Sequence, residues 1–228
     1  MQSTATALAQ SAKQGSSDTS SFVIDAYSQK DVLVYSEVAS FIETGYQTSF
    51  GAEISVTMPV LVAIKDGQSK AALGLRGHHQ PFFIEQYLAQ PVEYYVQSLF
   101  PSLSMQDAVE IGSLYSNAHR LTVPLLMIAV LACFFAGKRL LMLCGTSQVL
   151  NLLSKLGVSY QKIAGAKQTD LRDSSEQWGD YYQSNPQVVV VNLDGVTQLI
   201  ADNKFYQKLL ARLSNPIMQV RCKLAGQL

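Results

Sequence analysis

The chain has 228 residues, 48% of them hydrophobic, and its 17 basic residues balance 17 acidic ones, so the formal net charge is zero. A chain of this length can bury a full core as one large domain, or less simply as two small ones. Balanced charge without a dense Lys/Arg segment argues against nucleic acid, or an anionic membrane, as a partner recruited by electrostatics. The three cysteines show no CxxC pattern and no zinc-binding spacing with histidine, so a reducing cytoplasm fits best.

The first 20 residues are rich in Ser, Thr, Ala and Gln. They lack the basic stretch and the sustained apolar stretch of a secretory signal, although export by another route stays open. We predict a disordered tail over residues 1–20, and a single cytoplasmic domain over residues 21–228.

The first half of this domain alternates between strand and helix signals. Segments rich in β-branched and aromatic residues predict strands, and a turn segment, DGQSK, joins the last two into an antiparallel hairpin. For the second segment a helix beginning at Asp31 is the alternative, since apolar residues recur at helical spacing from Val38 to Phe50. The predicted strands are residues 21–27, 31–37, 55–65 and 71–77.

The second half alternates more regularly. Residues 81–100, which Pro91 divides, predict two short helical pieces or a strand and a helix. Gly137 is placed to end one helix, and Ser147 to cap the next. The later strands are predicted at residues 107–115, 138–146, 158–164 and 188–194, and the helices at 122–137, 147–157 and 201–213. This order predicts an α+β or α/β domain, with one central mixed sheet covered by helices.

The most hydrophobic segment of the chain has to be assigned either to a membrane or to a core. Its fully apolar part, residues 123–136, is shorter than the ~20 residues that a membrane helix needs. Arg120 and Lys138 bound it closely, and Pro124 lies where the first turn of a helix tolerates proline. We therefore predict a core helix between two strands and no membrane span, while contact with a membrane surface stays open.

A family resemblance rests on several motifs taken together. The segments FIETGYQTSFGA, AALGLRG, FFIEQYL, VEIGSLY, WGDYY and NPQVVVV occur in this order between about Val38 and Val191. In this combination the chain resembles the thermostable hemolysin family. The same order is similar to GNAT-type acyltransferases, particularly the acyl-homoserine-lactone synthase branch. The resemblance implies a GNAT-like fold, with a central, mixed, mostly antiparallel twisted sheet flanked by helices.

The sequence also departs from that branch at two places. Ser113 stands where the branch has an arginine, three residues after the motif glutamate, so the use of S-adenosylmethionine is not predicted. The turn SNAHRLTV lacks the glycines of the usual pyrophosphate loop, which makes close backbone approach to a pyrophosphate harder.

The resemblance places the reacting groups on one strand. Glu110 occupies the motif position and is the candidate general base, because an ammonium must lose a proton before its nitrogen can attack a thioester. Tyr115 is the candidate acid that protonates the departing thiolate. The alternatives are a salt-bridged strand glutamate and a tyrosine that only packs at the edge of the core.

The donor is expected at the turn after this strand. Backbone amides from Leu114 to Ser116 would hold the thioester carbonyl, and Asn117 belongs to the same turn. Arg120 would pair with a phosphate of coenzyme A or of a phosphopantetheine arm, since it lies at a helix N-terminus. The alternative is an ordinary loop with a solvated arginine.

The acceptor is expected near Arg76 and Glu85, with Phe50, Trp178 and Tyr181 as pocket walls. A structural ion pair and aromatic packing are the alternatives. His78 and His79 are adjacent and have no third ligand at a suitable spacing, so no metal site is predicted.

The predicted function is transfer of a fatty-acyl group from an acyl-CoA or acyl-carrier-protein thioester to a small amine or amino acid, as in natural product biosynthesis. Lysis would then follow from an amphiphilic product. A directly membrane-damaging protein and a non-catalytic GNAT-fold binding module remain as alternatives.

Overall fold

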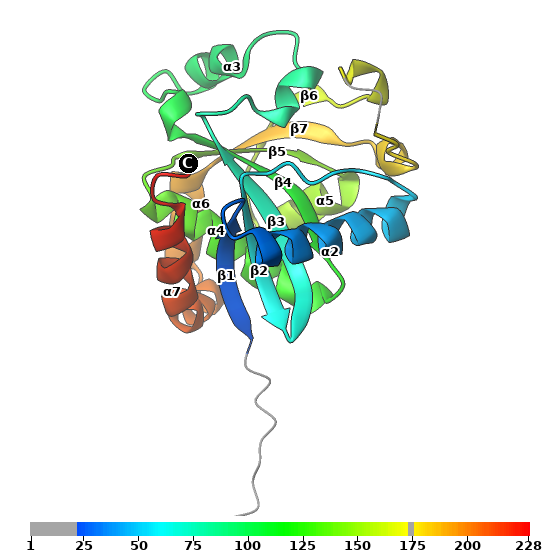
Figure 1. The fold of residues 1–228 in the computed structure, drawn as a ribbon. Coiled ribbons are helices and arrows are strands. Elements are labelled where there is room, and N and C mark those ends of the chain that lie inside the picture. The colour runs from blue at the N-terminus through cyan, green and yellow to red at the C-terminus, as the bar shows by residue number, and fades with distance from the viewer. Residues whose placement is uncertain (1–21, 173–175) are drawn as a thin grey trace, which may run out of the picture.

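The computed structural model describes residues 22–172 and 176–228, and the tail predicted over residues 1–20 lies outside them. Its seven strands form one sheet in the order β1-β2-β3-β4-β5-β7-β6 (Figure 1). All neighbouring pairs run antiparallel except β4 and β5, which run parallel. The predicted mixed, mostly antiparallel sheet is therefore confirmed. The strands are β1 (Val23–Ser28), β2 (Val60–Asp66), β3 (Gln68–Gly77), β4 (Ala108–Ser116), β5 (Leu140–Gly145), β6 (Gln161–Gly165) and β7 (Gln187–Asn192).

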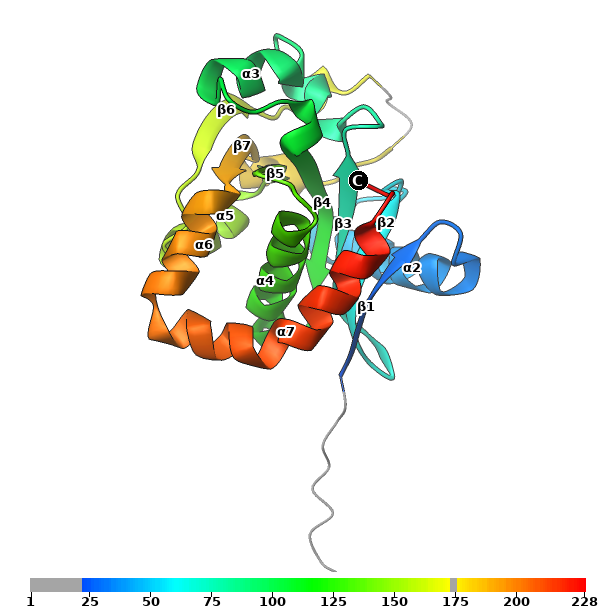
Figure 2. The same cartoon turned by 90° about the vertical axis from the view of Figure 1, so that its left-hand side faces the viewer.

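Helices cover both faces of this sheet. On one face α2 packs over β1 to β4, while α3 and the short helix η1 pack over β4, β5 and β7. On the other face α4 and α7 cross the strands, with α5 and α6 beside them (Figure 2). The α-helices are α2 (Val32–Phe50), α3 (Val92–Leu99), α4 (His119–Phe135), α5 (Ser147–Lys155), α6 (Leu193–Asp202) and α7 (Lys204–Leu224). The 3-10 helices are η1 (Phe83–Tyr87), η2 (Met105–Asp107), η3 (Gln168–Asp170) and η4 (Tyr181–Ser184).

Most predicted elements are confirmed, but residues 31–37 form helix rather than a strand. α2 begins at Val32, and its buried residues include Tyr35, Val38 and Ile42, which recur at helical spacing. Strand propensity of a β-branched run is a weak preference, and the single apolar face presented to the sheet overrides it.

Two helix boundaries also differ from prediction, each because of a capping side chain. Thr146, rather than Ser147, caps α5, since its hydroxyl accepts the Val149 N–H. The predicted terminal helix is interrupted at Asn203, whose side-chain oxygen accepts the N–H groups of Phe205 and Tyr206 and starts α7.

The predicted core helix is confirmed as α4. It begins at His119, so Pro124 lies in the second turn, and Gly137 follows the helix end with a positive φ of 92°. The sheet lies on one side of α4 and α7 on another, which explains why the helix is apolar around most of its circumference. Within residues 22–172 and 176–228, none of the helices combines the length and the hydrophobicity that a membrane crossing requires.

Candidate active site

The site lies where the two parallel strands separate. β4 and β5 pair only from Ala108 with Leu140 to Ile111 with Leu143. Beyond this point β4 continues along β3 to Ser116, while β5 continues along β7 to Gly145. The facing edges of both strands then have no strand partner within the described residues. Such an edge offers free backbone N–H and C=O groups to a ligand.

A β-bulge directs β4 away from β5. Ser113 and Leu114 together lie opposite the single residue Leu73 of β3, between the pairs Ala72–Tyr115 and Gly74–Gly112. Ser113 adopts a left-handed backbone with a φ of 52°, which costs an L-residue about 1–2 kcal/mol. Bulges of this kind bend a strand, and backbone strain concentrates at functional sites.

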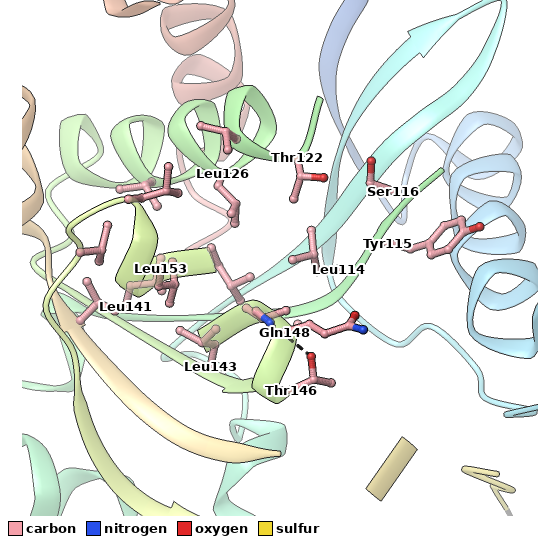
Figure 3. Close-up of a pocket in the computed structure, with 18 of the residues that line it drawn as sticks. Leu114, Tyr115, Ser116, Thr122, Leu126, Leu141, Leu143, Thr146, Gln148 and Leu153 are labelled. Atoms are coloured by element: carbon pink, nitrogen blue, oxygen red, sulfur yellow. Dashed lines mark hydrogen bonds between the residues drawn. The ribbon is translucent and has the colours of Figure 1, made fainter. Parts of the chain in front are cut away.

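An apolar cavity of about 530 Å³ lies where β4 and β5 separate, and residues of both strands and of α4 and α5 line it. Figure 3 shows leucine side chains from β4, α4, β5 and α5 around it. We call it the apolar cavity, and its lining includes Leu114, Leu126, Leu141, Leu143, Leu153, Val191 and Ile200. Its volume is typical of a small-molecule site.

A second, smaller cavity of about 80 Å³ lies on the α2 side of the sheet. We call it the small cavity, and its polar lining residues include Ser55, Thr57, Arg76, Glu110, Glu176 and Trp178. The two cavities share six lining residues, Tyr46, Ile111, Gly112, Ser113, Cys144 and Tyr181. They therefore meet at the gap between β4 and β5.

Glu110 is buried, and its carboxylate holds several groups together. It lies directly opposite Arg76 in the β3–β4 register, and the Arg76 Nη1 lies 3.3 Å from Glu110 Oε2. Oε2 also accepts the Phe83 N–H at 2.9 Å, and Oε1 accepts the Ile84 N–H at 3.0 Å. Burial raises the pKa of Glu110, while the Arg76 guanidinium and the two N–H groups act against that rise.

The carboxylate partner of Arg76 is therefore Glu110, and the alternative of an ion pair between Arg76 and Glu85 is wrong. Of the two residues predicted to bind the acceptor, only Arg76 lines the small cavity. Residues opposite each other on neighbouring strands project to the same face, whereas Glu85 lies in η1 and lines neither cavity. Arg76 also donates through Nη2 to the carbonyl and hydroxyl oxygens of Thr57, and through Nη1 to the Pro81 carbonyl.

Two glycines leave room for the loop that covers the small cavity. Gly74 and Gly112 lie opposite each other, and the Met58 side chain occupies the space where their side chains would be. The same loop brings Thr57 to Arg76. Thr57, Met58 and Gly112 are not among the predicted site residues, and the signal available in the sequence was a glycine in each of two neighbouring strands.

The predicted donor residues are divided by the structure. Leu114 and Ser116 line the apolar cavity, whereas Asn117 and Arg120 are exposed and lie outside its lining. His119 and Thr122, from the first turn of α4, do line the apolar cavity, although neither was predicted.

The ring of Tyr115 points toward α2 and away from the leucines of the apolar cavity (Figure 3). Its centroid lies 5.0 Å from that of Phe41, and the ring fills the space above Gly45. These contacts are those of a packing residue, and Tyr115 is also among the residues that line the apolar cavity. Its role as the acid stays a prediction.

The predicted aromatic walls do come together. Tyr181 lines both cavities, and its ring centroid lies 5.3 Å from that of Phe50 and 5.2 Å from that of Trp178. Phe50 belongs to the apolar cavity and Trp178 to the small one. These rings therefore form a continuous wall past the gap between the strands.

Cys144, whose thiol could act as a nucleophile, lies where the two cavities meet. Burial raises the pKa of its thiol to about 12, so the thiol is protonated near neutral pH and is a poor nucleophile. Among the residues that the structure describes, no group of three His, Cys, Asp or Glu side chains is arranged to hold a metal ion. His78 and His79 follow β3 in a turn, with ring centroids 3.9 Å apart.

The fold is similar to that of several solved acyl-homoserine lactone synthases and of an N-acyl amino acid synthase. The CoA-dependent acyl-homoserine lactone synthase BjaI is similar, with a TM-score of 0.54, 12% identity, and coverage of 85% of this chain and 90% of its own. FeeM, an N-acyl amino acid synthase from uncultured soil microbes, is similar with a TM-score of 0.52 and 10% identity, and the match covers 82% of this chain and 99% of FeeM. The acyl-homoserine lactone synthase LasI is similar with a TM-score of 0.51 and 10% identity, and the match covers 76% of this chain and 90% of LasI. The predicted GNAT-like fold is thus confirmed.

The family assignment follows from the sequence itself. The family model described as Thermostable hemolysin matches residues 28–197, so the chain belongs to this family, as the motifs between Val38 and Val191 indicated. No curated protein sequence matches the chain significantly.

Proposed function

We propose that the protein is an N-acyltransferase, which moves a fatty-acyl group from a thioester to a small amine or amino acid. The observation that carries this proposal is the meeting of a large apolar cavity and a small polar cavity at the gap between β4 and β5. One cavity suits a hydrocarbon chain, the other suits a compact polar molecule, and their junction is the place for the reacting carbon. This assignment agrees with the structural similarity to FeeM, an N-acyl amino acid synthase, and to BjaI, a CoA-dependent acyl-homoserine lactone synthase.

The donor is the thioester of a fatty acid. An acetyl group would leave most of a 530 Å³ apolar cavity empty, whereas a longer chain replaces water along the leucine walls. The thioester carbonyl lies at the bulge, where free N–H groups on the edge of β4 stabilise the negative charge that develops on its oxygen. Acyl-CoA and an acyl-phosphopantetheine on a carrier protein are both donors of this chemistry.

The reaction transfers the acyl group directly. The amine nitrogen attacks the carbonyl carbon, the new C–N bond forms, and the C–S bond breaks to release the thiol. The acceptor begins as an ammonium and loses two protons. The first passes to Glu110, directly or through a water molecule, and the second, which the nitrogen loses once the C–N bond has formed, passes to the departing sulfur. A carboxylate offers about four lone-pair sites, and the bonds to Arg76, Phe83 and Ile84 use three, so one remains for the first proton.

The protonated state of Cys144 supports direct transfer over an acyl-cysteine intermediate. We place the reaction in the cytoplasm, where the donor thioesters are made, and attribute lysis to the amphiphilic N-acyl product.

The test is to incubate the purified protein with acyl-CoAs of increasing chain length, or with acyl-carrier protein, and with a mixed pool of amines and amino acids. Mass spectrometry should show consumption of long-chain thioesters and formation of N-acyl products. If no thioester is consumed while the protein alone lyses liposomes, the membrane-damaging alternative replaces this proposal.

A further inference from the structure

Two residues that line the small cavity each carry a buried hydrogen-bond donor that has no partner in the described part of the chain. They are the Nε–H of Arg76 and the Nε1–H of Trp178. The two residues are only 7% and 8% exposed, and both line the small cavity. A buried donor without a partner costs about 1–3 kcal/mol, so two in one cavity point to a ligand that accepts from them.

The rest of the Arg76 side chain is already committed. Its Nη1 donates to Glu110 and to the Pro81 carbonyl, and its Nη2 donates to Thr57. These contacts fix the plane of the guanidinium and leave Nε as the free donor. An indole N–H can only donate, so the complement of both groups is an acceptor, and a carboxylate satisfies two donors at once.

The charges around the small cavity further restrict the chemistry of the ligand. Besides Arg76, the charged lining residues are Glu110 and Glu176, and Glu176 accepts the Ser55 N–H through Oε1 at 3.0 Å. One positive and two negative groups disfavour a plain anion. They suit a molecule that carries an ammonium group as well as a carboxylate. A simple amine would leave both free N–H groups without partners.

We propose that the small cavity binds a compact α-amino acid as the acyl acceptor, with its carboxylate held by Arg76 Nε and Trp178 Nε1. Its amino group then faces Ser113, where the two cavities meet. A volume of about 80 Å³ accommodates a few water-sized groups, which restricts the side chain to the size of glycine, alanine or serine. This assignment rests on the proposed acyl transfer for its role, although binding itself can be measured without turnover.

Trp178 is the single tryptophan of the chain, so its fluorescence reports on this cavity. Neither N–H group is exposed, so an entering carboxylate must displace the indole and change its emission.

We expect a saturable change in Trp178 fluorescence with glycine, alanine or serine. Ethylamine is alanine without its carboxylate, and propionate is alanine without its amino group. Neither compound should give a saturable change. The titrations are repeated with a long-chain acyl-CoA present, in case the donor binds first. A response to ethylamine equal to that to alanine, or no response to any of the three amino acids under either condition, overturns the inference.

The Trp178→Phe variant tests the N–H group by turnover. It keeps an aromatic ring and should raise KM for alanine roughly tenfold to a hundredfold, with a smaller effect on kcat, because it removes a hydrogen bond to a charged group. Tyr94→Phe, at an exposed position of α3 outside both cavities, is the matched control that loses one polar group and should keep the KM. An unchanged KM in Trp178→Phe contradicts the inference.

The two proposals fail in different ways. Selective binding of alanine without any consumption of thioester would refute the acyl transfer and leave the amino acid site standing. Acylation of ethylamine as efficient as that of alanine would refute the amino acid site and leave the acyl transfer standing.

Discussion

At the residue scale, Glu110 combines a structural and a proposed chemical role. Its carboxylate anchors η1 through Phe83 and Ile84 and pairs with Arg76, and it also lines the small cavity. A buried carboxylate with a partner on each oxygen is held in one orientation. Its remaining lone pair therefore has a defined direction, which a proton acceptor in catalysis requires.

Replacement of Glu110 by glutamine should abolish most turnover and change the pH profile. Burial raises the pKa of Glu110, so in the wild type turnover should fall on the acid side at a pH above 4.5, the ordinary carboxyl value, as the base becomes protonated. In Glu110→Gln this acidic limb should disappear. The variant should also lose roughly 1–3 kcal/mol of stability, because an amide nitrogen then faces backbone N–H donors.

The control for this experiment is Glu85→Gln, since Glu85 lies in η1 and lines neither cavity. It should keep the turnover and the acidic limb, with the limb moved to slightly lower pH, because the Glu85 charge contributes to the raised pKa of Glu110. Equal turnover in wild type and a folded Glu110→Gln would remove Glu110 as the base.

The three cysteines should differ in their reaction with iodoacetamide. Cys222 is exposed, whereas burial raises the pKa of Cys133 and of Cys144 to about 12. At neutral pH peptide mapping by mass spectrometry should find Cys222 alkylated first and the other two protected. Rapid alkylation of Cys144 would show a reactive thiol at the junction of the cavities and would reopen the acyl-cysteine route.

At the element scale, the contact between α2 and β4 has little tolerance. Gly45 packs against the Tyr115 ring so closely that a Cβ atom would overlap ring carbons. We expect Gly45→Ala to lower stability by about 1–2 kcal/mol, because overpacking outweighs the gain of about 1 kcal/mol in helix propensity. Thermal unfolding measures the effect.

Gly195→Ala is the matched control for this change. Gly195 is exposed in α6 and has open space around its missing side chain. Here only the propensity changes, so stability should rise by roughly 0.5–1 kcal/mol. Equal effects of the two substitutions would contradict the packing assigned to Gly45.

The wall that α4 gives to the apolar cavity should set the length of the acyl chain. Leu126 faces the cavity, so Leu126→Trp should fill part of it and lower kcat/KM for long-chain thioesters at least tenfold (Figure 3). Short-chain thioesters should be affected much less. Leu99→Trp, at a partly exposed position of α3 outside both cavities, is the control and should leave the chain-length profile unchanged. A uniform loss for all chain lengths in Leu126→Trp would place the chain elsewhere.

At the scale of the whole molecule, two cavities on opposite faces of one sheet meet through a gap between its strands. In the reaction that we propose, the sheet would keep a polar acceptor and an apolar donor apart except at that gap. The product would carry both a hydrocarbon chain and a polar head, which would account for the lytic activity in the family name.

Leakage of dye-loaded liposomes distinguishes this account from direct membrane damage. The purified protein alone should cause no leakage, and leakage should begin only after a long-chain thioester and an acceptor are both supplied. Addition of the extracted product without protein should reproduce it. Leakage by the protein alone would favour the membrane-damaging reading.

Several features of this protein follow from local sequence patterns. Periodicity and turn residues predicted the hairpin β2–β3, the passage from β4 to β6 and the core position of α4. The motifs around Glu110 indicated the family and the strand that carries the site. These signals lie within segments of the chain whose geometry repeats every two or 3.6 residues, so they can be recognised without knowledge of any distant contact.

The tertiary structure decided which residues share the site. The sequence paired Arg76 with Glu85, nine residues along the chain, whereas strand pairing joins it to Glu110, at a separation of 34 residues. The bulge at Ser113, the direction of the Tyr115 ring and the presence of Trp178 and Arg76 in the lining of one cavity likewise depend on which surfaces pack together. Sequence alone thus determined the elements and the family, because their patterns are local. Only the folded chain determined the cavities and the partner of the catalytic candidate, because these arise from contacts between distant segments.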